Sequence, residues 1–356
     1  MKKRIIAAAL IASVVLLGLT PTGCYLSRGA LEEARILSNR KPIAELVRDP
    51  SLDSVTRGKL KVVLDAREFA KSGLGLRTKE SFTTFSQLDT DTLVLVLSAA
   101  YKDSLKAYTW WFPIVGRVPY KGYFDFDRAR RDEQKLKKEG FDTYLRPSDA
   151  FSTLGWFNDP LLSTSLHRDS MDLANTVIHE LTHNTFYAPG QAYFNESFAS
   201  FVGARGAAAF FRRRGQEQAA REVEARWADE KLLARFWAGL LQSLDSAFAQ
   251  HPDSRVRRIE ARDSVYARAR VALVTEISRE FQTIGPTYAA RVALNNAALL
   301  ARRIYAQDLQ LFDDLYAREG RNLPRTVARI VAIAKANPKD PYAAVRRELL
   351  RLQSKR

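Results

Sequence analysis

Residues 169–187 read DSMDLANTVIHELTHNTFY, and the rest of the chain can be interpreted around this segment. Asp169 or Ser170 can cap a helix at its start, and Pro189-Gly190 ends the helix soon after Tyr187. Four apolar residues form a stripe along one face of this helix, namely Leu173, Val177, Ile178 and Leu181. The stripe predicts a buried helix that holds its other side chains rigidly.

Two histidines share one face of the same helix. His179 and His183 are four residues apart, so their imidazole rings lie nearly over one another and can bind one ion. Glu180 is three residues before His183, which places its carboxylate beside the ion, where it can take a proton from metal-bound water. Zinc acidifies such a water and polarises a carbonyl group, so the pattern predicts a hydrolytic Zn²⁺ site. Two surface histidines on an amphipathic helix are the alternative.

A catalytic zinc site needs a third protein ligand and keeps its fourth position open. We expect Glu196 to be this ligand, because a reversal at Pro189-Gly190 would pack a second helix, capped by Asn195, against the first. A first-turn glutamate that merely favours the helix dipole is the alternative interpretation of Glu196. Two further histidines are expected in surface or capping positions, namely His167 and His251.

The sequence before this segment changes character once. Residues 25–90 carry apolar residues at spacings of three to five and are expected to be helical. Residues 91–160 are expected to form a small sheet with an inserted helix at 125–140. The expected strands are 92–97, 110–124, 141–145 and 151–157.

The sequence after it is nearly all helical. Residues 169–215 are expected to form the two helices of the site, and residues 216–356 a long helical region. The helices expected in that region are 216–250, 254–282, 288–319 and 324–352. No internal repeat and no flexible linker divides the chain, so we predict a single α+β unit over 24–356 that is predominantly helical.

The first 23 residues have the layout of a bacterial secretion signal. Basic residues at 2–4 precede an uncharged apolar run at 5–19, which is short for a membrane-spanning helix. A secretion signal predicts export from the cytoplasm. An uncleaved N-terminal membrane anchor is the alternative.

Cys24 is the only cysteine, so no intrachain disulfide can form. It follows the small residue Gly23 at the end of the apolar run and resembles the lipid-acceptor cysteine of bacterial lipoproteins, although Pro21 stands where a leucine-like residue is usual. Tyr25, rather than an aspartate, follows it, so the resemblance implies an outer-membrane anchor facing the periplasm. Several acyl chains on one cysteine would hold the protein stably.

The chain is basic, with a formal net charge of +16. Removal of residues 1–23 would take away Lys2, Lys3 and Arg4 and leave +13. Export argues against nucleic acid as a partner, and the charges are interleaved with acidic residues along helices. We interpret them as solvated helix faces; attraction to anionic lipid head groups beneath the anchor is the alternative.

Two histidines and a glutamate on a following helix resemble the metal ligands of gluzincins, and this implies a zincin-like core. Gluzincins similar to thermolysin carry an aspartate four residues after the ligand glutamate, where it supports a ligand histidine. This sequence has Ser200 at that position, so the supporting role is unassigned.

Several segments, together with HELTH, resemble a family of bacterial lipoproteins known as putative aminopeptidases. These segments are PYKGYF at 119–124, STLGWFNDPLL at 152–162, FNESFA at 194–199 and LNNA at 294–297. They span most of the chain from Cys24 to about Tyr316. The resemblance implies a zinc-dependent metallopeptidase domain and, with less specific support, cleavage from the amino end of peptides.

Residues for the substrate are less well determined. In zincins, an edge strand just before the zinc helix pairs with the substrate backbone, and Ser152, Thr153, Leu154 and Gly155 could serve; an ordinary buried strand is the alternative. An aminopeptidase also needs carboxylates for a free amine, for which Asp159 and Glu180 are conceivable. A tyrosine often stabilises the oxyanion in gluzincins. Tyr305 is preferred over the other available tyrosines, Tyr123, Tyr187, Tyr193 and Tyr288.

The leading hypothesis is a zinc metallopeptidase in the periplasm, with peptides as substrate. One alternative is a lipid-anchored binding or scaffold protein with a structural or decayed zinc site. A structural site would be closed by a fourth protein ligand, whereas a catalytic site keeps one position open. Another alternative is a zinc amidase that acts on cell-wall fragments, because zinc chemistry does not distinguish these substrates.

Overall fold

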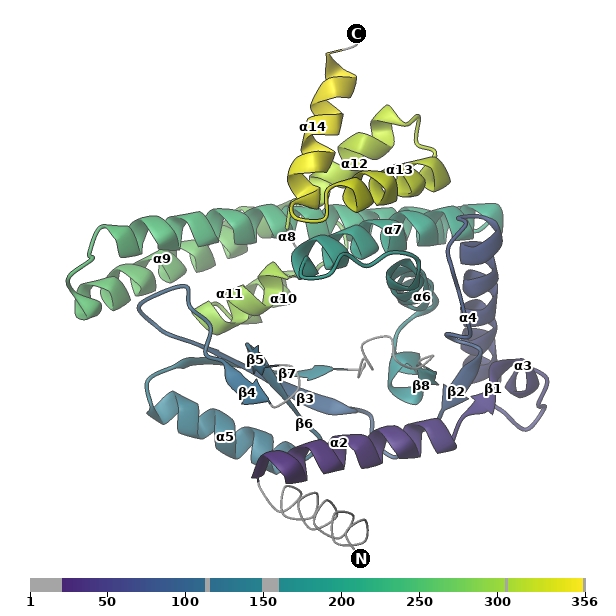
Figure 1. Ribbon diagram of the computed structural model, residues 1–356, viewed down its shortest axis with the longest axis horizontal. Coiled ribbons are helices and arrows are strands. Elements are labelled where there is room, and N and C mark those ends of the chain that lie inside the picture. Colours follow the sequence, from purple (N-terminus) through teal and green to yellow (C-terminus); the bar gives the residue numbers. More distant parts are fainter. Residues whose placement is uncertain (1–20, 113–115, 149–159, 305–306, 355–356) are drawn as a thin grey trace, which may run out of the picture.

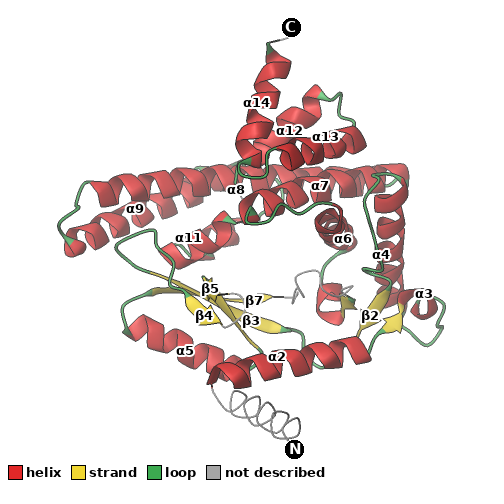
Figure 2. Ribbon diagram, viewed as in Figure 1, coloured by secondary structure: helices red, strands yellow, loops and turns green. Residues whose placement is uncertain are grey.

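The computed structural model describes residues 21–112, 116–148, 160–304 and 307–354. Two long neighbouring helices, α7 (Ala192–Arg213) and α8 (Glu217–Ala249), cross the molecule. The C-terminal helices α12–α14 lie on one side of them, and the strands with α5 and α2 lie on the other (Figures 1 and 2). The described part is α+β and predominantly helical, which confirms the predicted fold class.

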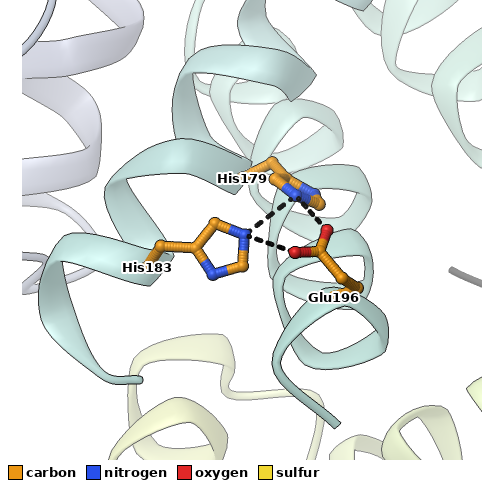
Figure 3. Close-up of side chains that lie close together, drawn as sticks. All are labelled: His179, His183 and Glu196. Carbon is orange, nitrogen blue, oxygen red and sulfur yellow. Dashed lines mark hydrogen bonds and ion pairs between the residues drawn. The ribbon is translucent and has the colours of Figure 1, made fainter. Parts of the chain in front are cut away.

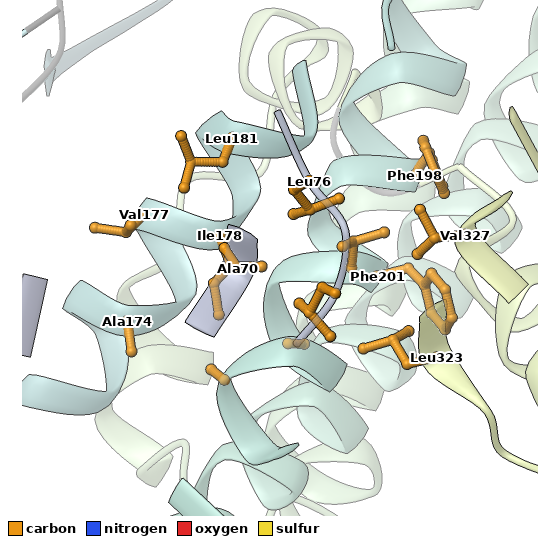
Figure 4. Close-up of a cluster of buried hydrophobic side chains, with 14 of the residues drawn as sticks. Ala70, Leu76, Ala174, Val177, Ile178, Leu181, Phe198, Phe201, Leu323 and Val327 are labelled. Carbon is orange, nitrogen blue, oxygen red and sulfur yellow. The ribbon is translucent and has the colours of Figure 1, made fainter. Parts of the chain in front are cut away.

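Helix α6 (Ser170–Thr185) carries the two histidines and packs between α7 and α4 (Ser54–Ser72). The predicted apolar stripe of α6 is fully buried: Leu173, Val177, Ile178 and Leu181 are each 0% exposed. Figure 4 shows three of these side chains within the main core, together with Phe198 and Phe201 of α7. Burial of several large apolar side chains, each contributing about 1.5–3 kcal/mol, fixes α6 in place.

The largest sheet of the described residues has three antiparallel strands. β3 (Val94–Ala100) lies between β6 (Tyr120–Tyr123) and β7 (Asp142–Ser148), with Leu97 opposite both Lys121 and Leu145. Helix α5 (Phe126–Lys138) packs against it. The predicted helix at 125–140 and the strand at 141–145 are therefore confirmed.

The expected strand at 110–124 is divided into three. β4 (Trp110–Phe112) and β5 (Gly116–Val118) form a two-stranded sheet, and only β6 joins β3. Gly116, the first residue of β5, has a φ of 71°, a left-handed conformation that favours glycine. The expected strand at 151–157 lies entirely within 149–159, outside the described residues.

The prediction that residues 25–90 are helical is only partly correct. Helices α2 (Pro21–Ser38), α3 (Ile43–Leu46) and α4 are present. Two short strands interrupt the pattern, β1 (Lys41–Pro42) and β2 (Thr84–Ser86), and β2 pairs in parallel with β8 (Leu161–Leu162), just before α6. Strands of two or three residues have no periodicity of their own, so a helical pattern hides them.

A second cluster of buried residues lies where the C-terminal half of α8 packs against α9 (Arg255–Thr275). Helices α10 (Pro286–Arg291) and α11 (Asn296–Arg303) contribute to it. The single helix expected at 288–319 is therefore wrong. Asn295 caps α11 by accepting a hydrogen bond from the backbone N–H of Ala298 at 2.8 Å, which starts a new helix inside that range.

Three helices complete the chain: α12 (Leu309–Arg318), α13 (Leu323–Ala336) and α14 (Pro341–Gln353). The single helix expected at 324–352 is also wrong, because Pro338 and Pro341 stand where it would continue and Pro341 begins α14. Among the described residues, no helix is long and apolar enough to cross a membrane.

Candidate metal centre

Helix α6 begins where the sequence predicts. Asp169 is its N-cap, and the Asp169 side chain accepts hydrogen bonds from the backbone N–H groups of Met171 and Asp172, each at 2.9 Å. Arg226 of α8 forms ion pairs with Asp169 at 2.6 Å and with Asp172 at 2.8 Å. The first turn of α6 is therefore tied to α8 before the chain reaches the histidines.

The expected role of Asn195 as a helix cap is wrong. Helix α7 begins at Ala192, and its N-cap is Gln191 rather than Asn195. The Asn195 side chain instead accepts a hydrogen bond from the backbone N–H of Ala188 and donates one to its carbonyl oxygen, both at 2.8 Å. This buried amide fixes the reversal between α6 and α7, so the neighbouring Glu196 is directed toward α6.

The three expected ligands lie together (Figure 3). His179 Nε2 is 3.2 Å from His183 Nε2 and 3.4 Å from a carboxylate oxygen of Glu196, and His183 Nε2 is 3.6 Å from the other oxygen. Each side chain remains partly accessible, between 17% and 23% exposed. Donors 2.0–2.1 Å from a tetrahedral ion lie about 3.3–3.4 Å apart, so these three could hold a metal ion compatible with zinc.

The protonation of the three groups is coupled. Burial would lower the pKa of His179, but the hydrogen bond to Glu196 and the charges of Glu180, Glu196 and Glu230 raise it overall. Burial, followed by the charge of His179, lowers the pKa of His183 to about 4. Burial would raise the pKa of Glu196, whereas its contacts with the two histidines lower it. The cluster thus favours a carboxylate and a neutral His183, which are the forms that bind a metal ion.

Glu180 lies next to His179 on α6, and its side chain is exposed to solvent. Its charge acts on His179, so the carboxylate lies near the three ligands without belonging to them. The nitrogen Nδ1 of His183 is buried and has no hydrogen-bond partner among the residues whose placement is described. Within the described part of the chain, no residue therefore replaces the missing support for His183.

The other expected residues lie elsewhere or outside the described ranges. His167 is 61% exposed and 3.6 Å from Asp91, and neither His167 nor His251 joins the ligand group. Tyr187 is exposed, with its ring 6.2 Å from the ring of His183. The positions that fall outside the described residues are Tyr305, Ser152, Thr153, Leu154, Gly155 and Asp159.

Tyr123 and Tyr193, two other expected candidates, have contacts of their own. The buried Tyr123 donates a hydrogen bond to Asp132 at 2.7 Å, which gives its hydroxyl a structural partner. The Arg303 guanidinium lies 5.3 Å from the ring centre of Tyr193, one turn before Glu196. This contact brings the end of α11 close to the first turn of α7.

Three residues near the ligands were not predicted from the sequence. Gly203 of α7 faces α6, where an added Cβ would overlap the Asn175 side chain and lie 3.2 Å from Cβ of His179. Arg226 and Glu230 both come from α8. The only sequence signal was the spacing of seven residues between Glu196 and Gly203, which places both on one helix face.

A family model described as "Putative aminopeptidase" matches residues 24–345 of the chain, which include all three candidate ligands. Neither the curated proteins nor the solved structures yielded a match.

Proposed function

We propose that this chain, which belongs to the putative aminopeptidase family, is a zinc-dependent peptidase that removes residues from the amino end of peptides. Membership supports a hydrolase acting on peptide substrates. The single observation that carries the metal dependence is the convergence of three ligand atoms, from His179, His183 and Glu196, within 4.8 Å of one another.

The three side chains would hold the ion from two helices that are fixed independently. His179 and His183 belong to the buried helix α6, whereas Glu196 follows the reversal that the Asn195 amide ties down. Ligands on packed helices need no rearrangement to bind the ion, which favours affinity. A zinc ion there would lower the pKa of a water molecule and polarise the scissile carbonyl group.

Glu180 would act as the general base. Its exposed carboxylate lies beside the ligand cluster and is not one of the ligands, and in the proposed reaction it takes a proton from the attacking water and delivers it to the leaving amine. Glu196 cannot share this role, because its two oxygens face the two histidines.

The test compares wild-type protein with Glu180→Gln. We expect about one zinc ion per chain in both proteins, and a loss of about 10²–10⁴-fold in peptide hydrolysis for the variant. Digestion of a peptide library, followed by mass spectrometry, should show removal of one N-terminal residue at a time. A wild-type protein that binds no zinc near neutral pH would sink the proposal, and internal cuts would overturn its amino-terminal specificity.

A structural zinc site in a scaffold protein is less well supported. Such a site is closed by four protein ligands, whereas only three candidate donors come together in the part of the chain that the structure describes. Cell-wall amides contain the same scissile group as peptides, so adding cell-wall fragments to the digestion separates an amidase from a peptidase.

We also propose that Cys24 carries the lipid that anchors the exported chain at the outer membrane. Cys24 lies in the first turn of α2, and the family match begins at this residue. In the native bacterium, Cys24→Ser should lose incorporation of a labelled fatty acid and leave the membrane fraction. Unchanged labelling of this variant would rule out the proposed lipid site.

A further inference from the structure

Glu230 of α8 lies beside the candidate metal centre. Arg226, one turn earlier on α8, forms its ion pair with Asp172 of α6, and His179 lies on the same face of α6 two turns after Asp172. The next turn of α8 presents Glu230, whose charge acts on His179. Glu230 is thus the third acidic residue that acts on His179, after Glu180 and Glu196, and it is neither a ligand nor on the ligand helices.

Among the described residues, the carboxylate of Glu230 has no hydrogen-bond or ion-pair partner, in contrast to its neighbours on α8 and α6. Asp229 accepts hydrogen bonds from the backbone N–H groups of residues 282–284 at 2.8–3.0 Å, and Asp172 is paired with Arg226. No hydrogen bond or ion pair connects Glu230 to any residue within the described ranges. An unpaired carboxylate in such a place is a ready site for a cation.

The surroundings of Glu230 leave the residue accessible to solvent but partly desolvate its carboxyl group. The residue is exposed to solvent, yet enough protein surrounds its carboxyl group that desolvation, together with the charge of Asp172, raises its pKa to about 7. A positive charge bound there would offset the cost of keeping the carboxylate ionised.

A small cavity adjoins Glu230 at the junction of α6, α7 and α8. Its volume is about 30 Å³, and its polar lining consists of Asp172, Asn175, Arg226 and Glu230, of which Arg226 is paired with Asp172. Asn175 is one turn before His179, so the cavity lies next to the ligand cluster along α6. It has room for a water molecule or an ammonium group, but not for an amino-acid side chain.

The geometry points to a role in substrate recognition: we infer that Glu230 binds the free α-amino group of the peptide, so that substrates with a protonated N-terminus are selected. This inference rests on the proposed function. The amine nitrogen of an N-terminal residue is about 2.5 Å from the carbonyl carbon that is attacked. A carboxylate of the enzyme that binds this amine must therefore lie close to the metal ligands. Glu180 and Glu196 would be engaged in proton transfer and metal binding, so among the described acidic residues that act on His179, Glu230 is the one available for the amine.

The test uses full-length wild-type protein and Glu230→Gln with two peptides, one with a free amine and its desamino analogue, in which hydrogen replaces the amine. We expect the variant to raise KM for the amine peptide about 10- to 100-fold, the range of a charge-assisted hydrogen bond, with a smaller change in kcat. The inhibition constant of the desamino peptide should stay within about twofold, because that peptide makes no contact with the carboxylate.

Two control variants distinguish a structural role of Glu230 from a role in amine binding. Asp245→Asn removes an exposed charge from the same helix and should change neither constant. Glu230→Asp retains the charge and should recover part of the affinity for the amine peptide. Zinc content and thermal unfolding of each variant report whether the metal centre and the fold are intact.

Three results would contradict the inference. An unchanged KM for the amine peptide means that Glu230 does not bind the amine. Equal losses for the amine and desamino peptides mean that Glu230 only supports the structure. If the wild-type protein removes no N-terminal residue from the amine peptide, the proposed function fails, and the inference fails with it; the first two outcomes leave that function standing.

Discussion

Gly203 sets the distance between the two helices that carry the candidate ligands. A Cβ added at this position would overlap the Asn175 side chain and lie 3.0 Å from the Asn175 carbonyl oxygen. We expect Gly203→Ala to push α7 away from α6, to cost about 1–3 kcal/mol of unfolding free energy and to weaken zinc binding. Chemical denaturation and zinc titration measure the two effects.

Gly239→Ala is the matched control for this prediction. Gly239 lies inside α8, and nothing lies within 4 Å of its added Cβ. Alanine there should stabilise the protein by about 0.5–1 kcal/mol and leave zinc affinity unchanged. If Gly203→Ala behaves like this control, close packing at Gly203 does not position the ligands.

At the scale of single residues, the local part of the site could be predicted and the distant part could not. His179, Glu180 and His183 lie on one helix, so their spacing alone places them together. Glu196 required only the reversal at 189–190. Glu230 reaches the site through the packing of α8 on α6, 34 or more positions along the chain from the other residues, and no local pattern records such a contact.

Among the helices, α12 is held to α7 and α8 by a buried carboxylate. Asp313, 6% exposed, accepts two hydrogen bonds from Arg205 at 2.8 Å, one from Nε1 of Trp227 at 2.9 Å and one from Lys231 at 2.5 Å. Asp313→Asn would leave Lys231 without its counter-charge and Arg205 with only its longer contact to Glu224, at 3.7 Å. We expect the unfolding free energy at pH 7 to fall by about 3 kcal/mol, as measured by denaturant titration.

The same carboxylate gives this effect a pH dependence. Burial would raise the pKa of Asp313, but the contacts with Arg205 and Lys231 lower it below the ordinary value of 3.8. Its contribution is therefore complete above about pH 4 and is lost as the pH falls through the folded-state pKa. The gap between wild type and variant should narrow below pH 4, whereas Asp314→Asn, at an exposed neighbour, should show no gap at any pH.

At the scale of elements, residues that cap or end helices explain both the correct and the wrong predictions of helix boundaries. Asp169 and Pro189-Gly190 marked the ends of α6 because a side-chain cap and a break are local features. Asn195 looked like the same kind of cap but ties a loop instead, and Asn295 caps a helix that periodicity alone had merged with its neighbours. A polar side chain can satisfy several backbone groups, and only the tertiary structure determines which ones.

Across the whole molecule, Asn296 joins the helical region to the sheet. Its side chain is fully buried and donates hydrogen bonds to the carbonyl oxygens of Tyr101, Lys102 and Ser104 at 2.8–3.3 Å. It also accepts a hydrogen bond from the Tyr266 hydroxyl at 2.8 Å. The LNNA segment, which suggested the family, thus has a structural role.

We expect Asn296→Ala to lower the unfolding free energy by about 2–4 kcal/mol, because it leaves buried carbonyl groups and a hydroxyl without partners. Denaturant titration measures this loss. Gln242→Ala, at an exposed position of α8, serves as the control and should change stability by less than about 0.5 kcal/mol. Equal stability of the two variants would show that this junction contributes nothing to folding.

The pairing of short strands that are distant along the chain could not be predicted from the sequence. Within the described residues, the division into three small sheets depends on strands as short as the two residues of β1 and β8, which pair with residues more than 40 positions away. Such pairing reflects how the helices bring the chain together rather than any local preference. The helical character could be predicted because amphipathic periodicity repeats over many turns.

Removal of the metal should lower the stability of the whole fold. The candidate ligands belong to α6 and α7, and both helices contribute many residues to the main core. At a free zinc concentration about 1,000 times Kd, binding to the folded state alone contributes about 4 kcal/mol, so a chelator should lower Tm by about 5 °C in a chain of this length. Glu180→Gln should show the same shift, because Glu180 is not a ligand, whereas His183→Ala should have a lower Tm that the chelator no longer changes. A wild-type Tm indifferent to zinc and chelator would mean that the three donors lie together without binding the ion, and the proposed chemistry would lose its basis.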